Sequence, residues 1–251
     1  MSERARQFIG LDNGGQGRCP NRPIGAGRGR GEGVPNPQHR GGWLEEAPAA
    51  DLGDTLRAAI TSAAVRLAEY VGYRNAGTVE FLLAPDGEFY FMEMNTRIQV
   101  EHPVTEVVTG VDLLAEQLRI AGGERLSFAQ SDIALEGAAV ELRINAEDPG
   151  NNFMPTPGEL ARFDLPGGPG VRVDSGFVAG DRISPFYDSM LAKLICWGAD
   201  RRQALARARQ ALAELRIEGV SSTASLHGEL LGDRELIGGP VHTRWLEERL
   251  G

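Results

Sequence analysis

Two strand-like runs separated by a turn signal constrain the middle of this 251-residue chain. The runs are residues 78–83 and 88–93, both rich in β-branched and aromatic residues, and Pro85-Asp86-Gly87 lies between them. Asp-Gly favours a tight two-residue loop, so the sequence predicts a β-hairpin. With Asp86 and Gly87 as that loop, position 85 pairs with 88, and the register places Glu80 directly opposite Glu93.

Two carboxylates opposed on one face of a hairpin repel each other, and a bound cation would relieve that repulsion. Asn95 lies two residues past Glu93 and therefore on the same face. Carboxylate and amide oxygens are hard ligands suited to Mg²⁺ or Mn²⁺. The pattern predicts a metal site formed by Glu80, Glu93 and Asn95. The alternative is that one glutamate points to solvent.

A polar loop is expected directly after the hairpin, over residues 96–110. It brings Arg97, Gln99, Glu101 and His102 close to the predicted metal site. An arginine can hold a small planar anion with two hydrogen bonds, a glutamine adds a donor, and a nearby glutamate can act as a base. These residues predict an anion-binding pocket. A loop whose polar side chains are simply solvated is the alternative.

The flanking sequence predicts an α+β fold of mainly antiparallel strands. Apolar residues recur at three- and four-residue steps from Asp51 to Tyr73, which is typical of a helix packed along one face. Further helices are expected over residues 111–121 and 201–215, the second capped by Asp200. Strands are expected at residues 139–144, 160–163, 171–175 and 190–197.

The first 42 residues have a different composition from the rest. Eleven are Gly, and seven Arg against three acidic residues give a charge of +4, which leaves −13 for the remainder of a chain whose net charge is −9. Residues 25–33 have no helical or strand period, so residues 1–42 are predicted to be a disordered Gly/Arg-rich tail, native to the fold or not. An RNA-binding arginine-glycine segment is the less favoured alternative.

Composition also restricts the partners. The acidic body argues against nucleic acid. No apolar run approaches the roughly 20 residues of a membrane span. The first ten residues lack a secretory pattern, so a cytoplasmic location is expected. Cys19 and Cys196 form neither a disulfide framework nor a metal-ligand spacing.

The segment from Glu93 to Glu106 reads EMNTRIQVEHPVTE and closely resembles the signature of the biotin carboxylases, which are ATP-grasp enzymes or domains of acetyl-CoA, propionyl-CoA and pyruvate carboxylases. Three further stretches agree, at residues 77–81, 140–148 and 187–193, and the similarity covers about residues 44–250. The resemblance implies the C-terminal half of an ATP-grasp domain at residues 43–125. A biotin carboxylase C-terminal α+β domain of mainly antiparallel strands would follow at residues 135–250.

The resemblance also implies an activity, the ATP-dependent carboxylation of biotin with bicarbonate through carboxyphosphate. Two Mg²⁺ or Mn²⁺ ions would bridge the ATP phosphates, held by Glu80, Glu93 and Asn95.

Bicarbonate and biotin have implied ligands of their own. Arg97, Gln99 and the backbone of Val100 would bind bicarbonate, and Glu101 would deprotonate it for attack on the γ-phosphate. Arg143 would bind biotin and stabilise its enolate, since an arginine is a fixed and always-charged donor.

The implied partners are a biotin carboxyl carrier protein or domain, a carboxyltransferase component, and a second copy of the chain bound through the C-terminal domain. Arg172 matches a position of the family's dimer interface, whereas Pro169 stands where an aromatic residue is usual. The parent complex stays open, because acetyl-CoA, propionyl-CoA, pyruvate and urea carboxylases share this module. Neither nucleic acid nor a membrane is an expected partner.

Parts of the family pattern are not recognisable in residues 1–42, namely a nucleotide-fold domain, a Gly-rich lid and phosphate-binding lysines. The sequence therefore suggests a truncated or frame-shifted product with little activity alone. One alternative is a non-catalytic dimerising remnant that associates with intact carboxylase subunits. Another ATP-grasp ligase, such as a carbamoyl-phosphate or purine-pathway enzyme, is disfavoured by the run from Arg97 to Pro103.

Overall fold

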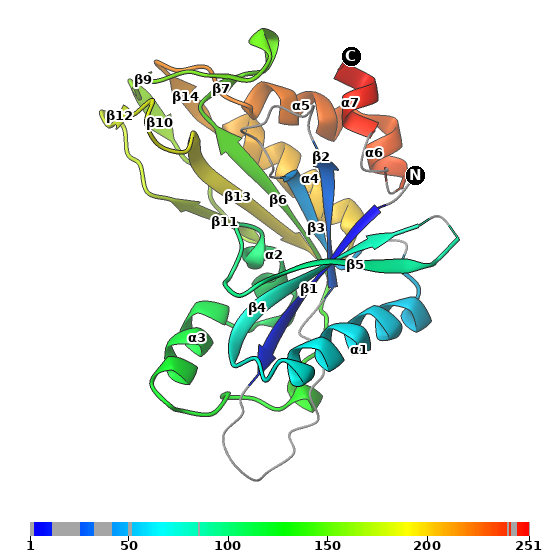
Figure 1. Cartoon of the computed structure of the whole chain (residues 1–251). Helices are drawn as coiled ribbons and strands as arrows, with labels where there is room; N and C mark the ends of the chain where they lie inside the picture. Colours follow the sequence, from blue (N-terminus) through cyan, green and yellow to red (C-terminus); the bar gives the residue numbers. More distant parts are fainter. Residues whose placement is uncertain are drawn as a thin grey trace.

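The fold is built around an eight-stranded sheet, in which every strand is antiparallel to its neighbours (Figure 1). The computed structural model describes residues 3–11, 26–32, 42–49, 52–84, 86–239, 241 and 245–250, the first two ranges by their backbone alone. The strand order is β11-β13-β6-β3-β2-β1-β4-β5. In sequence order these strands are β1 (Glu3–Leu11), β2 (Ala26–Glu32), β3 (Gly42–Ala47), β4 (Asn75–Leu83), β5 (Phe89–Asn95), β6 (Ala138–Asn145), β11 (Val171–Ser175) and β13 (Met190–Gly198).

Helix α1 (Asp54–Tyr70) packs against the β4 end of the sheet. Its buried residues Ile60, Ala64 and Ala68 share an apolar cluster with Val79 and Phe81 of β4. The predicted helix is confirmed, although it is shorter than residues 51–73 because the chain turns just after it through Gly72 at a φ of 62°. The short helix α3 (Leu113–Ala121) is also confirmed, and the Asp112 side chain caps its first turn.

The helices of the C-terminal part gather at the other end of the sheet from α1 and α3 (Figure 1). They are α4 (Arg201–Glu214), α5 (Ala224–Gly232), α6 (Arg234–Gly238) and α7 (Trp245–Leu250). The predicted cap of α4 is confirmed, since the Asp200 carboxylate accepts a hydrogen bond of 2.7 Å from the Gln203 N–H. Small residues on α4, among them Ala204 and Ala208, let it pack closely against β13 in the larger apolar cluster.

Short elements complete the C-terminal block. Three two-stranded sheets pair β7 (Glu147–Asp148) with β8 (Met154–Pro155), β9 (Gly158–Glu159) with β12 (Arg182–Ile183), and β10 (Arg162–Asp164) with β14 (Arg216–Glu218). Two 3₁₀ helices occur, η1 (Gln130–Asp132) and η2 (Pro149–Asn151). The buried Cys196 carries a free thiol, whereas Cys19 lies outside the described residues.

The predicted disordered tail differs from the structure wherever that part of the chain is described. Residues 3–11 and 26–32 form β1 and β2, which lie between β3 and β4. A sheet ladder is made by backbone N–H and C=O groups, so a Gly-rich segment can pair without any side-chain period. The rest of residues 1–42, apart from Gly42, lies outside the described residues.

The loop predicted over residues 96–110 was wrong for its second half, which forms helix α2 (His102–Thr109). Pro103 occupies the first turn, where its missing N–H has no intrahelical partner to lose, and Gly110 ends the helix at a φ of 72°. Among the described residues no helix is both long and apolar enough to cross a membrane.

Candidate active site

The paired glutamates of the β4–β5 hairpin lie opposite each other, as predicted. One amide nitrogen, Asn95 Nδ2, donates hydrogen bonds of 3.1 Å to Glu80 Oε1 and of 3.1 Å to Glu93 Oε1. The Glu80 carboxylate is buried and Glu93 is exposed. Both carboxylates therefore converge on a single point at the edge of the protein, and Asn95 lies on the same face.

The hairpin reaches this register by a different route from the predicted two-residue loop. The Ala84 N–H donates to the Glu88 carbonyl at 2.8 Å, so three residues form the loop. A β-bulge then shifts the register, because Glu80 pairs with Glu93 while Phe81 pairs with Phe91. The extra residue on β5 offsets the longer loop, and the two carboxylates end up opposed.

The pair fits a divalent cation. Across the described residues no group of three or more His, Cys, Asp or Glu side chains is arranged to hold a metal. The donors at this point are two carboxylates and one side-chain amide, which would leave positions on the ion for phosphate oxygens and water. A fourth side chain contacts this group from the interior, since Gln99 Nε2 donates to Glu80 Oε1 at 2.7 Å.

The residues predicted to bind an anion do not all point to one place. Arg97 is exposed and its Nη1 donates to the carbonyl of Ile98 at 3.0 Å, so its side chain is held along its own loop. Gln99 points to the Glu80 carboxylate instead. The carbonyl of Val100 accepts a hydrogen bond of 3.1 Å from Lys193 Nζ on β13, which anchors the backbone on which Glu101 stands.

Arg143 lies at the centre of a buried charged cluster. Its Nη2 is 2.8 Å from Glu101 Oε2 and 2.5 Å from Glu45 Oε1. Burial opposes the charge of the guanidinium, but Glu45 and Glu101 outweigh it, and the pKa of Arg143 is raised. Glu101 and Arg143, predicted from distant parts of the sequence, are thus brought together.

A third buried carboxyl, Glu141, lies two residues before Arg143 and opposite Glu45 in the β3–β6 ladder. It is fully buried, and neither of its side-chain oxygens has a hydrogen-bond partner within the described residues. Burial and the neighbouring Glu45 raise its pKa well above the usual range. Burial and the charge of Glu45 therefore favour the protonated form of the Glu141 carboxyl over the ionised form.

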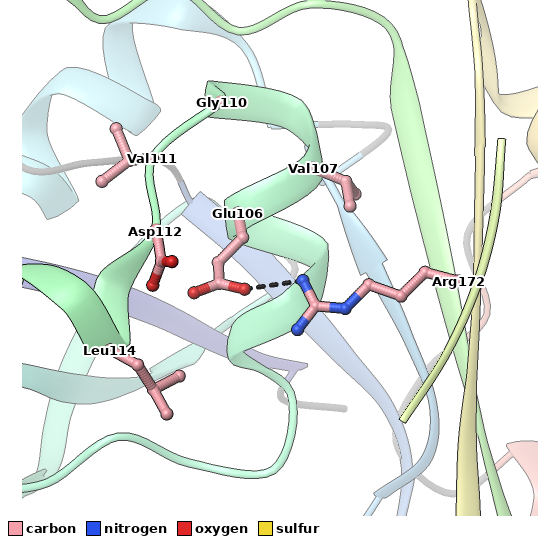
Figure 2. Close-up of a pocket in the computed structure, with 7 residues that line it drawn as sticks. All are labelled: Glu106, Val107, Gly110, Val111, Asp112, Leu114 and Arg172. Atoms are coloured by element: carbon pink, nitrogen blue, oxygen red, sulfur yellow. Dashed lines mark hydrogen bonds and ion pairs between the residues drawn. The ribbon is translucent and has the colours of Figure 1, made fainter. Parts of the chain in front are cut away.

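A row of ion pairs leads away from the loop along β11, and Figure 2 shows its first member, the pair of Glu106 with Arg172. Glu106 of α2 pairs with Arg172 at 2.7 Å, and its other oxygen accepts the N–H of Leu113 at 2.8 Å. Arg172 also binds Asp174, which lies 3.4 Å from Lys193 Nζ. Burial raises the pKa of Asp174, but its bonds to Arg172 outweigh that and the pKa is lowered. The row thus ends on the lysine that holds Val100.

His102, the last of the polar residues picked from the loop, faces inward. Its Nδ1 lies 2.7 Å from the Gln99 carbonyl, and Nε2 lies 4.0 Å from Glu106. Burial lowers the pKa of this imidazole, although the hydrogen bond to Gln99 opposes the shift. His102 therefore stabilises the turn that leads into α2, and none of these contacts is to Glu80 or Glu93.

Three residues of the cluster were not predicted from the sequence. They are Glu45, Glu141 and Lys193, each on a strand that reads as apolar or as part of a matching stretch. The one usable signal was charge at alternate positions of a strand that is otherwise buried, as at Glu141 and Arg143 of β6. That signal shows that the charges need partners, but it does not say which residues supply them.

Comparison with known protein families divides the chain into two parts. Residues 32–129 match the family described as the carbamoyl-phosphate synthase L chain, ATP binding domain. Residues 141–248 match the biotin carboxylase C-terminal domain.

Among curated proteins, the chain is 53% identical over 205 residues to a pyruvate carboxylase subunit of Methanothermobacter thermautotrophicus, covering 82% of this chain and 42% of that protein. It is 51% identical over 205 residues to biotin carboxylase of Nostoc sp., covering 82% and 46%.

A solved structure agrees. The biotin carboxylase domain dimer of Hydrogenobacter thermophilus 2-oxoglutarate carboxylase, in complex with MgADP, ADP and bicarbonate, superposes with a TM-score of 0.92 at 39% identity, covering 99% of this chain and 53% of that one. The fold, the opposed carboxylates and the charged loop place the chain in the ATP-grasp class of proteins. The chain belongs to the biotin carboxylase family, of which it covers part of the ATP-binding domain and the C-terminal domain. It spans a little under half the length of the curated relatives named above.

Proposed function

We propose that this chain carries the metal, bicarbonate and biotin side of a biotin carboxylase active site, which carboxylates biotin with bicarbonate at the expense of ATP. The observation that carries the proposal is the contact of 2.8 Å between Arg143 and Glu101, next to a hairpin whose two glutamates converge on one point. A base, an anion-stabilising cation and a metal-type carboxylate pair then belong to one site.

Glu80, Glu93 and Asn95 would hold Mg²⁺ or Mn²⁺. The ions would neutralise the phosphate charge of ATP, which the acidic body of this chain does not do itself. Gln99 supports this role because its amide fixes the buried Glu80 carboxylate at 2.7 Å.

Arg97, Gln99 and the Val100 N–H are proposed as the bicarbonate ligands, and Glu101 as the base. Glu101 takes the proton of bicarbonate, whose oxygen then attacks the γ-phosphorus, and the bond to ADP breaks to give carboxyphosphate. Lys193 supports this step by holding the carbonyl of Val100 at 3.1 Å, which fixes the peptide that leads into Glu101.

Arg143 is proposed to act in the second half of the reaction. Carboxyphosphate breaks down to CO₂ and inorganic phosphate, and the released phosphate takes the proton of biotin N1. Negative charge then develops on the ureido oxygen before N1 attacks CO₂. An arginine that is buried and always charged is suited to stabilise that oxyanion. Because Arg143 is bound to Glu101 in the absence of substrate, it would exchange that partner for biotin.

The partners proposed are a biotin carrier protein or domain, a carboxyltransferase component and a second copy of the chain. The Hydrogenobacter relative is a dimer of this domain, and one similar protein is an acyl-coenzyme A carboxylase subunit of Mycobacterium leprae. Arg172, proposed for the dimer interface, is 38% exposed in the side chain while it binds Glu106 and Asp174. It is therefore reachable by a partner subunit.

An assay with ATP, magnesium, free biotin and labelled bicarbonate tests the activity. Weak bicarbonate-dependent phosphate release and carboxybiotin formation are expected from this chain alone, and Glu101→Gln should lower both further. Turnover that Glu101→Gln leaves unchanged would refute the assigned base. Complete absence of turnover would refute activity of this chain, and the metal site is then judged by cation binding alone.

A further inference from the structure

The edge of β6 changes partner at Arg143. Up to that point β6 pairs with β3, whose ladder ends where Leu44 faces Leu142. Beyond it, Thr223 at the start of α5 takes over: its N–H donates to the carbonyl of Asn145 at 3.0 Å, and its hydroxyl accepts the N–H of Asn145 at 3.0 Å. A residue from a helix thus continues the hydrogen bonding of the strand.

The carbonyl of Arg143 accepts two hydrogen bonds from the same source. Thr223 Oγ1 donates at 3.0 Å, and His227 Nε2, one turn further along α5, donates at 2.8 Å. Both side chains are fully buried. The single hydroxyl proton of Thr223 and the Nε2 proton of His227 satisfy both lone pairs of this carbonyl.

His227 is suited to be a permanent donor. Burial lowers the pKa of its imidazole to about 4, against the opposing effect of the hydrogen bond to Arg143. Its Nδ1 is buried and has no partner within the described residues. The imidazole therefore stays neutral around neutral pH, with its one proton on Nε2.

We propose that Thr223 and His227 are positioning residues that set the place of Arg143. This inference rests on the proposed function of Arg143 and names the residues that hold its backbone carbonyl in place. The Arg143 guanidinium binds both Glu45 and Glu101 through Nη2, so its backbone has little freedom to shift without breaking one of these contacts. The C-terminal helix α5 thereby holds the residue that would meet biotin.

Four substitutions separate positioning from packing. His227→Leu and Thr223→Val remove a donor while keeping similar volume, and His227→Gln and Thr223→Ser restore a donor. Leu231→Ala is the matched control, because Leu231 is a fully buried residue on the same helix whose side chain is apolar and makes no hydrogen bond. Thermal unfolding of every variant gives its loss of stability.

The first measurement follows Arg143 directly. In protein labelled with ¹⁵N-arginine, the guanidinium signals of Arg143, assigned by their loss in Arg143→Lys, are expected to shift or broaden in His227→Leu and Thr223→Val. They should return in His227→Gln and Thr223→Ser, and they should stay in place in Leu231→Ala. Unchanged Arg143 signals in His227→Leu, or equal changes in Leu231→Ala, would overturn the inference.

The second measurement is kinetic. In the carboxylation assay His227→Leu should lower the kcat of biotin carboxylation by about 10-fold or more, with bicarbonate-dependent ATP cleavage without biotin changed less, since misplacement of about 1 Å can cost about 100-fold. His227→Gln should recover most of the loss. Equal losses in both reactions would count against a role through Arg143. If no variant and no parent chain turns over, the proposed activity fails, while the spectra still decide whether Arg143 is positioned by α5.

Discussion

Nη2 of Arg143 lies 2.8 Å from Oε2 of Glu101, although the two residues are 42 positions apart in the chain. Their side chains are 11% and 6% exposed. The proposed base and the proposed oxyanion-stabilising cation are therefore paired with each other in the free protein, and Glu45 shares the same guanidinium nitrogen.

Arg143→Met is expected to destabilise the fold by about 3–5 kcal/mol, because it leaves Glu101 and Glu45 without their shared cation. Adding Glu101→Gln should recover part of that loss. Urea unfolding of the two single variants and the double variant measures the coupling. Strict additivity of the two changes would contradict a direct ion pair.

Glu141→Gln should alter how stability depends on pH. The folded pKa of Glu141 is raised, so its favourable contribution is fully present below the pKa of the unfolded carboxyl, about 4.3, and is lost as the pH rises toward the folded value. The glutamine variant has no proton to lose. It should therefore gain in stability relative to the parent chain between about pH 4 and pH 7, as measured by urea unfolding. Parallel curves would show that Glu141 is ionised in the fold, and the exposed Glu88→Gln is the control.

Manganese is expected to bind the hairpin carboxylates and to raise the melting temperature, since a ligand at about 100 times its Kd adds about 2.7 kcal/mol. Glu80→Gln and Glu93→Gln should each weaken this shift strongly. Glu88→Gln, on the same hairpin but away from the pair, should leave it unchanged. Thermal melts over a manganese titration measure the effect, and equal shifts in all three variants would exclude this site.

Arg201→Met should weaken the attachment of helices α4 and α6 to strand β3. The Arg201 guanidinium binds both carboxylate oxygens of Glu46 at 2.9 Å and also the carbonyl of Leu236 at 2.6 Å. Glu46 is buried, so loss of this arginine should cost about 3–5 kcal/mol in urea unfolding. The neighbouring Arg202 is exposed, and Arg202→Met should change stability by less than about 0.5 kcal/mol. Equal losses for the two substitutions would show that the ion pair between Arg201 and Glu46 adds nothing to the free energy of unfolding.

Local sequence patterns predicted the parts of the site that local structure creates. The opposed pair Glu80 and Glu93 follows from a hairpin register, and the Asp200 cap follows from a residue type at a helix start. Even here the route differed, because a longer loop and a bulge compensate each other and neither leaves a separate signal in the sequence.

Long-range contacts were not accessible in the same way. Nothing in the spacing shows that Gln99 turns toward Glu80, that Lys193 reaches the carbonyl of Val100, or that His227 reaches that of Arg143. These contacts depend on which strands become neighbours in the sheet. Strands β1 and β2 were missed for a related reason, since their pairing uses backbone groups that every sequence possesses.

The bulge between Glu80 and Phe81 has a consequence for how this hairpin tolerates change. Met92 is the additional residue on β5, so the register set at the tip, where Ala84 bonds to Glu88, differs by one residue from the register of the two glutamates. Glu80 would face Glu93 equally with a two-residue loop and no bulge, or with the three-residue loop and the bulge that the structure has. Removing Met92 would leave the two glutamates opposed in an unbroken ladder, so the bulge alters the local twist of the hairpin without changing which side chains face each other.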